Sequence, residues 1–200
     1  MKLAKVFGFA MGLVISSAAF AQQLSLGQPA YGGSGCPAGT ASATVSPDGS
    51  AVSILFDQYV AEAGSNGKRI DRKSCNLAIP VNVPQGYSVA LLKLDYRGYN
   101  AVPSGGRNQF NVEYFWAGSR GPSLRRTFTG PENDTFTLTD ELVASTLVWS
   151  ACGAQVNFRV NTSMVAQANS RLDDTIASLD SADVSGELLY HFQFRRCNGW

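Results

Sequence analysis

The one histidine of this chain, His191, is the only imidazole that could serve as a general base. A serine or cysteine hydrolase needs such a base beside its nucleophile, so either activity would depend on this residue. His191 alternates with Gln193 and Arg195, which predicts a position on the wetter side of a strand. No GxSxG sequence, which would present a serine nucleophile, accompanies it. We therefore expect a surface histidine and predict no catalytic residue.

Four acidic side chains near the C-terminus could in principle bind calcium: Asp173, Asp174, Asp180 and Asp183. Their spacing does not match the DxDxDG pattern of a calcium loop, so we expect a solvated acidic segment. One histidine and no CxxC cannot complete a zinc site. We predict no metal and no cofactor. Carboxylate pairs for glycoside hydrolysis leave little trace in spacing, so a secreted hydrolase with an unrecognised carboxylate site stays the alternative function.

The charge pattern carries more information, although the net charge is only +1. Residues 96–131 contain five arginines and one acid, whereas residues 132–187 contain nine acids and two arginines. Arginine and tyrosine in glycine-rich loops are good interface anchors. We predict binding residues at Arg97, Tyr99, Arg107, Arg120, Arg125 and Arg126. The alternative is that the basic and acidic segments only balance each other on one molecule.

The partner of such arginines would be an anionic surface polymer, for example an acidic polysaccharide or lipopolysaccharide, or another envelope protein. Near-neutral charge and the lack of any recognition motif predict no nucleic-acid binding. The sequence thus favours a non-catalytic binding module at the cell envelope or in the medium.

The N-terminus has the features of a signal peptide. Lys2 and Lys5 precede a short apolar run, and Ala19-Phe20-Ala21 fits the small-x-small rule for cleavage. The apolar run is too short for a spanning helix, so we expect a secreted or periplasmic protein that does not span the membrane after cleavage. The leader looks bacterial, and we assign no role to the glycosylation sequons at 133–135 and 161–163.

Four cysteines in an exported chain predict two disulfides, with three possible pairings. We favour Cys36–Cys75 and Cys152–Cys197, because these local pairs close loops of moderate length. Each bond would stabilise the fold by about 3–4 kcal/mol on the loop-entropy account.

All these side chains must be positioned by β-strands, which the alternation of apolar and polar residues indicates. The alternation is clearest in the runs 77–83, 110–116, 156–164 and 188–194. About ten such strands predict an all-β antiparallel two-sheet sandwich. Ser170 could cap at most one short helix. We expect a signal peptide at 1–21, a flexible leader at 22–35 and one β-sandwich domain at 36–200.

The run 77–83 and the run 87–96 form the expected nucleus of the fold. Pro84-Gln85-Gly86 separates them, and this composition predicts a hairpin turn between two paired strands. The second run is apolar on both faces, which indicates a strand near the middle of a sheet. Residues 62–71 and 97–108 are expected to be loops.

Five short sequences occur in an order that resembles a known secreted family. They are GSGCPAGT at 33–40, RKSCN at 72–76, DYRGY at 95–99, WSACG at 149–153 and FRRC at 194–197. The resemblance is to domain of unknown function 4360 and runs from about Gly33 to Cys197. It implies a small secreted, disulfide-bonded domain. It implies no functional residues, because the family has no established activity.

The exported protein should begin at Gln22 and contain two disulfides with no free thiol. Intact-mass spectrometry, with and without alkylation under denaturing conditions, measures both properties. A thiol that reacts on the native protein would contradict the structural role of the cysteines.

Overall fold

The computed structural model describes residues 25–45, 47, 51–141, 147–179 and 187–197, which contain thirteen strands and no helix. The strands are β1 (Ser25–Leu26), β2 (Ala30–Gly32), β3 (Ala41–Val45), β4 (Ala51–Phe56), β5 (Val60–Ala63), β6 (Ile70–Asn82), β7 (Tyr87–Val102), β8 (Arg107–Trp116), β9 (Ser123–Thr129), β10 (Glu132–Glu141), β11 (Gln155–Gln167), β12 (Thr175–Ser178) and β13 (Glu187–Arg196).

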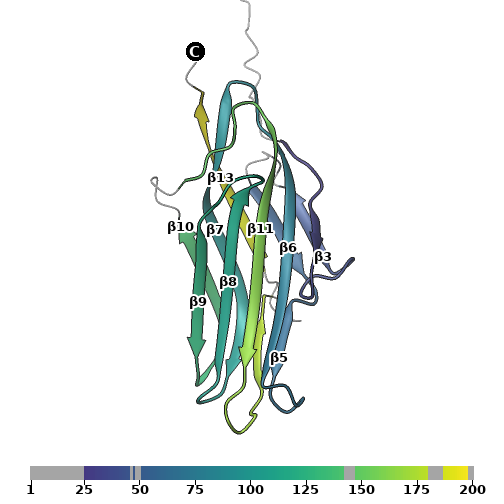
Figure 1. Cartoon of the computed structure of the whole chain (residues 1–200), viewed down its shortest axis with the longest axis vertical. Coiled ribbons are helices and arrows are strands. Elements are labelled where there is room, and N and C mark those ends of the chain that lie inside the picture. Colours follow the sequence, from purple (N-terminus) through teal and green to yellow (C-terminus); the bar gives the residue numbers. More distant parts are fainter. Residues whose placement is uncertain (1–24, 46, 48–50, 142–146, 180–186, 198–200) are drawn as a thin grey trace, which may run out of the picture.

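Two antiparallel sheets face each other in an elongated sandwich (Figure 1). Sheet A has the order β1-β6-β11-β8-β9, with β2 also paired to β6. Sheet B has the order β3-β4-β13-β7-β12-β5, with β10 also paired to β7. The predicted all-β antiparallel sandwich with two disulfides is confirmed.

Consecutive strands β6 and β7 lie in different sheets. β6 pairs with β1, β2 and β11, whereas β7 pairs with β10, β12 and β13. The hairpin predicted around Pro84-Gln85-Gly86 is therefore wrong. A tight turn is present, since the Tyr87 N–H donates to the Pro84 carbonyl at 3.1 Å. It carries the chain across to the facing sheet, because alternation fixes the buried side of a strand but not its partner.

β7 is longer than expected and sits inside sheet B, with strands on both sides. Its central position confirms the prediction made from its two apolar faces. It continues to Val102, so most of the predicted loop at 97–108 is strand, and only residues 103–106 separate β7 from β8. The predicted loop at 62–71 likewise shortens to residues 64–69.

The short helix predicted after Ser170 is wrong. The side chain of Asn169 accepts hydrogen bonds from the N–H groups of Arg171 and Asp173, both at 3.1 Å. Leu172 adopts a left-handed backbone with φ 61°. Because the Asn169 side chain binds amides near the start of the proposed helix, the chain turns and enters β12 instead.

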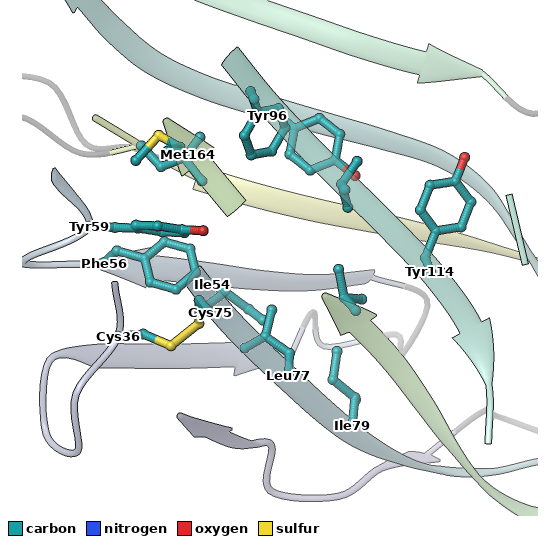
Figure 2. Packing of buried hydrophobic residues seen from close by; sticks show 14 of the residues in the cluster. Cys36, Ile54, Phe56, Tyr59, Cys75, Leu77, Ile79, Tyr96, Tyr114 and Met164 are labelled. Carbon is teal, nitrogen blue, oxygen red and sulfur yellow. A yellow bond between two sulfur atoms is a disulfide. The ribbon is translucent and has the colours of Figure 1, made fainter. Parts of the chain in front are cut away.

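Aliphatic and aromatic side chains fill the space between the sheets (Figure 2). The rings of Tyr96 in β7 and Phe110 in β8 meet edge to face at 5.1 Å, so this contact joins sheet B to sheet A. Nearby, the buried Asn108 of β8 donates from Nδ2 to Oδ1 of Asn100 in β7 at 2.9 Å. A polar bond and an apolar contact thus hold the two sheets in one register.

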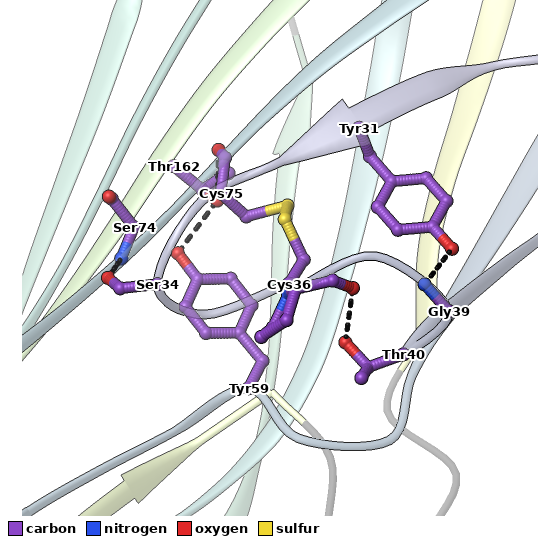
Figure 3. Close-up of a disulfide and its surroundings, with 10 residues drawn as sticks. Tyr31, Ser34, Cys36, Gly39, Thr40, Tyr59, Ser74, Cys75 and Thr162 are labelled. Carbon is purple, nitrogen blue, oxygen red and sulfur yellow. Dashed lines mark hydrogen bonds between the residues drawn. A yellow bond between two sulfur atoms is a disulfide. The ribbon is translucent and has the colours of Figure 1, made fainter.

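The disulfide Cys36–Cys75 is fully buried and ties the segment after β2 to β6 (Figure 3). Tyr59 lies beside it, with its hydroxyl 2.8 Å from Oγ1 of Thr162. That Oγ1 donates in turn to the Cys75 carbonyl at 3.1 Å. Burial raises the pKa of the Tyr59 phenol above its ordinary value, so the group stays neutral and hydrogen-bonded. The second disulfide is Cys152–Cys197, so both favoured pairings are present.

The stretch expected to be a flexible leader is partly ordered. β1 pairs with β6 at Asn82 and Val81, and β2 pairs with it at residues 76–78. These contacts add two short strands to sheet A. The polar, glycine-rich sequence of this stretch did not predict them, because such residues are depleted in strands.

Several sequence predictions lie outside the described residues. They concern the signal peptide, Asp180, Asp183 and most of the turn at 46–49. Among the described residues, no helix has the length and hydropathy that a membrane span requires.

Gly35→Ala should destabilise the protein, because a Cβ there would lie 2.3 Å from Cδ2 and Cε2 of the buried Tyr59 ring. We expect the free energy of unfolding to fall by about 1–3 kcal/mol, as for other overpacked sites. Urea denaturation with both disulfides intact measures this change.

Gly32→Ala is the matched control, because no heavy atom lies within 4 Å of a Cβ at that position. Its effect should stay within about 0.5 kcal/mol. Equal stability of the two variants would contradict the tight packing of Tyr59 against the backbone at Gly35.

Candidate functional site

The arginine and tyrosine residues predicted to bind a partner divide between the two sheets. Arg97 and Tyr99 lie in β7 on the outward side of sheet B, since their neighbour Tyr96 is buried in the core. Arg97 pairs with Thr137 of β10. The Tyr99 hydroxyl donates to Oδ1 of Asn133 on the same strand, β10. This pair therefore belongs to the face of sheet B.

Arg107 in β8 and Arg125 in β9 lie on the outward side of sheet A. Arg126 follows Arg125 but pairs with the inward-facing Phe110, so it projects from the other side of edge strand β9. Arg120 lies in the connection between β8 and β9. The six predicted residues thus do not gather on neighbouring loops, and their role in binding stays a prediction.

The outward side of sheet A, which we call the polar face, is positively charged. Four exposed arginines occupy its outward positions, of which the sequence prediction had only two: Arg72, Arg107, Arg125 and Arg159. Glu113 is the carboxylate among the outward positions of the described strands of this sheet. None of the four arginines makes an ion pair with a carboxylate of a described residue. Their charges are therefore available to a ligand.

A groove of about 480 Å³ crosses the middle of the polar face, over β6, β11, β8 and β9. Strand pairing arranges its side chains in rows that run across the strands, about 4.8 Å apart from one strand to the next. Two such rows make most of its surface, and they differ in their hydrogen bonding.

The first row is hydrogen-bonded to itself. Arg125 donates from Nε to Oδ1 of Asn111 at 2.9 Å, and Asn111 donates from Nδ2 to Oγ of Ser163 at 3.3 Å. These bonds link β9, β8 and β11 and hold the guanidinium of Arg125 at the edge of the groove. The first row is therefore a fixed border with a positioned charge.

The second row consists of Ser123, Glu113, Asn161 and Asn76, on four consecutive strands. Its side chains make no hydrogen bond to one another or to any other described residue. Each asparagine amide can donate two hydrogen bonds and accept others, and Glu113 accepts only. This row therefore offers a line of unused donors and acceptors in the lining of the groove.

Phe115 borders the second row at the next outward position of β8, paired with Arg159 of β11. It is half-buried, so part of its side chain is open to solvent. The groove thus combines amides, one carboxylate and the guanidinium of Arg125, and Arg159 and Phe115 lie at the next outward positions beyond its second row.

This arrangement offers little for hydrolysis. Glycoside hydrolysis uses two carboxyl groups on either side of the scissile bond, and Glu113 is the carboxylate among the residues that line the groove. The described residues also contain no group of three or more histidine, cysteine or acidic side chains placed to hold a metal ion. The chemistry of the groove is that of hydrogen bonding and charge attraction.

Of the acidic residues considered from sequence, Asp173 and Asp174 lie outside the groove, and so does His191. Asp173 accepts from Nδ2 of Asn169 at 2.7 Å and Asp174 from the Ser65 N–H at 2.8 Å, so both stabilise turns. Hydrogen bonds from Ser65 hold the pKa of Asp174 below its ordinary value. His191 pairs with Ala51 and Lys93 in sheet B, and its side chain lies outside the described residues.

Sequence reasoning missed Asn76, Asn161 and Glu113. A usable signal existed, since all three are outward positions in strongly alternating runs. Asn161 is also part of a sequon, and its neighbour Thr162 is buried against Tyr59. The order of the strands in the sheet, which places residues 76, 113 and 161 in one row, cannot be read from the sequence.

The family model for "Domain of unknown function (DUF4360)" matches residues 22–197. The chain belongs to this family. The predicted family resemblance is confirmed. One relative, an "Uncharacterized secreted protein" of Arthroderma benhamiae, is 34% identical over 169 residues, which are 84% of this chain and 69% of the relative. That relative is fungal, so it gives no support to the bacterial origin expected from the leader.

A solved structure, TmCBM61 in complex with beta-1,4-galactotriose, is 11% identical and covers 84% of this DUF4360 chain and 88% of its own. Its TM-score is 0.31, and nothing about this chain follows from so small a likeness. The two disulfides of the DUF4360 chain are typical of an oxidising compartment, in agreement with the predicted secreted or periplasmic location.

Proposed function

We propose that this protein is an exported, non-catalytic binding module whose polar face holds an anionic polysaccharide. The observation that carries the proposal is the second row of the groove, Ser123, Glu113, Asn161 and Asn76. These side chains make no hydrogen bond to described residues, and their row lies between Arg125 in the first row and Arg159 at the next outward position of β11, neither of which makes an ion pair with a described carboxylate.

Hydroxyl groups are the natural partners of this row. A sugar hydroxyl both donates and accepts, and an asparagine amide can satisfy both roles at once. The carboxylate of Glu113 can accept hydrogen bonds from two sugar hydroxyls. It does not need a proton from the acidic groups of the ligand. Phe115 adds an apolar surface for the face of a sugar ring.

The arginines select the charge of the polymer. Four guanidinium groups against one carboxylate make the polar face positive on a chain whose net charge is +1. Arg125, fixed by Asn111, can form a paired hydrogen bond with a uronate carboxylate or a sulfate. The attraction weakens with salt, as the Debye length falls from about 10 Å at 0.1 M to about 3 Å at 1 M.

An open groove also suits a polymer better than a small molecule. Pockets for small ligands are mostly apolar and enclose most of the ligand surface. This groove is lined mostly by polar residues of four strands and is open toward solvent on the outward side of sheet A. Export to the medium or periplasm, supported by the disulfides and the secreted relative, brings the protein to such polymers.

Of the residues predicted from sequence, the proposal keeps Arg107 and Arg125 as binding residues and adds Arg72 and Arg159. Arg97 and Tyr99 are assigned to the other sheet. We further propose that residues 25–35 are part of the domain through β1 and β2.

The test is affinity electrophoresis in gels that contain polygalacturonate, a sulfated glycan, lipopolysaccharide or, as the uncharged control, a neutral glucan. The mature protein should be retarded by polygalacturonate at 0.1 M salt, and less so at 1 M. Asn76→Ala with Asn161→Ala, and separately Arg125→Gln with Arg159→Gln, should each weaken retardation about tenfold or more, since each pair removes groups worth roughly 1 kcal/mol apiece.

Arg97→Gln is the matched control, because it removes one exposed arginine from sheet B without touching the polar face. It should bind as the wild type does. Retardation that is lost with Arg97→Gln and kept in the polar-face variants would contradict the assigned face. No retardation by polygalacturonate, sulfated glycan or lipopolysaccharide would reject the polymer and leave a protein partner.

A further inference from the structure

The two disulfides lie in opposite environments. Cys36 and Cys75 are both 0% exposed, so no reagent reaches their sulfur atoms in the folded protein. Cys152 is exposed, and Cys197 is partly exposed. A difference in access of this kind separates an inert bond from one that can undergo exchange.

The exposed disulfide borders a hollow of about 350 Å³, lined by Ser88, Cys152, Arg195, Arg196 and Cys197. The guanidinium of Arg195 lies 4.3 Å from the ring centroid of Trp149, a cation–π contact that restrains it beside the disulfide. Neither arginine makes an ion pair with a carboxylate of a described residue. The hollow is therefore a positively charged approach to a disulfide.

Ser88 adds a group that faces the sulfur. It is only 5% exposed, and its Oγ lies 3.6 Å from Sγ of Cys197. A disulfide sulfur is a weak acceptor, whereas a thiolate is a strong one. The hydroxyl is thus placed to stabilise negative charge on Cys197 more than it stabilises the intact bond.

We infer that Cys152–Cys197 is a thiol–disulfide exchange site that accepts small anionic thiols. The arginines attract the incoming thiolate, and Ser88 donates to the sulfur that leaves. This activity is separate from the polar face and does not depend on it.

The exchange balances in two steps. A thiolate attacks Sγ of the exposed Cys152, forming a mixed disulfide with it, while the Cys152–Cys197 bond breaks and its electron pair stays on Cys197. A second thiolate then attacks the sulfur of the bound thiol. The products are one low-molecular-weight disulfide and the Cys152 and Cys197 thiolates, so two thiols are oxidised and the protein bond is reduced.

The experiment compares three thiols of different charge on the mature folded protein: 2-mercaptoethanesulfonate, 2-mercaptoethanol and cysteamine, at equal thiolate concentration. Samples are alkylated at intervals, digested and analysed by mass spectrometry. Cys152 and Cys197 should become alkylated while Cys36–Cys75 stays intact, with the mixed disulfide on Cys152 appearing first.

The anionic thiol should react roughly two- to fivefold faster than the cationic one, the size of effect that exposed charges give. This preference should disappear in Arg195→Gln with Arg196→Gln and should shrink in 1 M salt. Ser88→Ala should slow exchange with all three thiols and leave their order unchanged. The salt series on the wild type supplies the same test if the arginine variant does not fold.

Three results would overturn the proposal. The first is equal opening of both disulfides by any thiol. The second is a cationic thiol reacting as fast as the anionic one. The third is a charge preference that persists in the arginine variant or at high salt.

Discussion

Strict alternation along β6, β8 and β11 is the constraint on which this structure depends. Successive side chains of a strand point to opposite sides, so each core residue fixes an outward neighbour. Val160 and Thr162 face the core, and Asn161 between them must face solvent. The burial that stabilises sheet A therefore also builds the polar face, and a slip of one residue would destroy both.

The inward side of the same strands is closed by contacts that leave little freedom. Tyr59, Thr162 and the Cys75 carbonyl form one hydrogen-bonded unit beside a buried disulfide. Asn108 and Asn100 bond across the sheets, and the rings of Tyr96 and Phe110 pack beside them. A rigid core of this kind holds the rows of the groove in register without any help from the ligand.

The fold class, the central position of β7 and the disulfide pairing could be predicted, because alternation and cysteine spacing are local properties. The grouping of charged residues could not. Arg125 and Arg126 are adjacent in sequence and therefore point to opposite sides of a strand. Arg72 and Arg159 are far apart in sequence but share one face, because β6 pairs with β11. Strand order, which decides such neighbours, has no local signature.

The most direct test of the polar face is an NMR titration of the ¹⁵N-labelled mature protein with a short oligogalacturonate. The account predicts shift changes in the side-chain amides of Asn76 and Asn161 and in the backbone amides of β6, β8 and β11 around them. Arg97, Tyr99 and their neighbours in sheet B should not shift. Changes confined to sheet B, or no change at saturating ligand, would contradict the account.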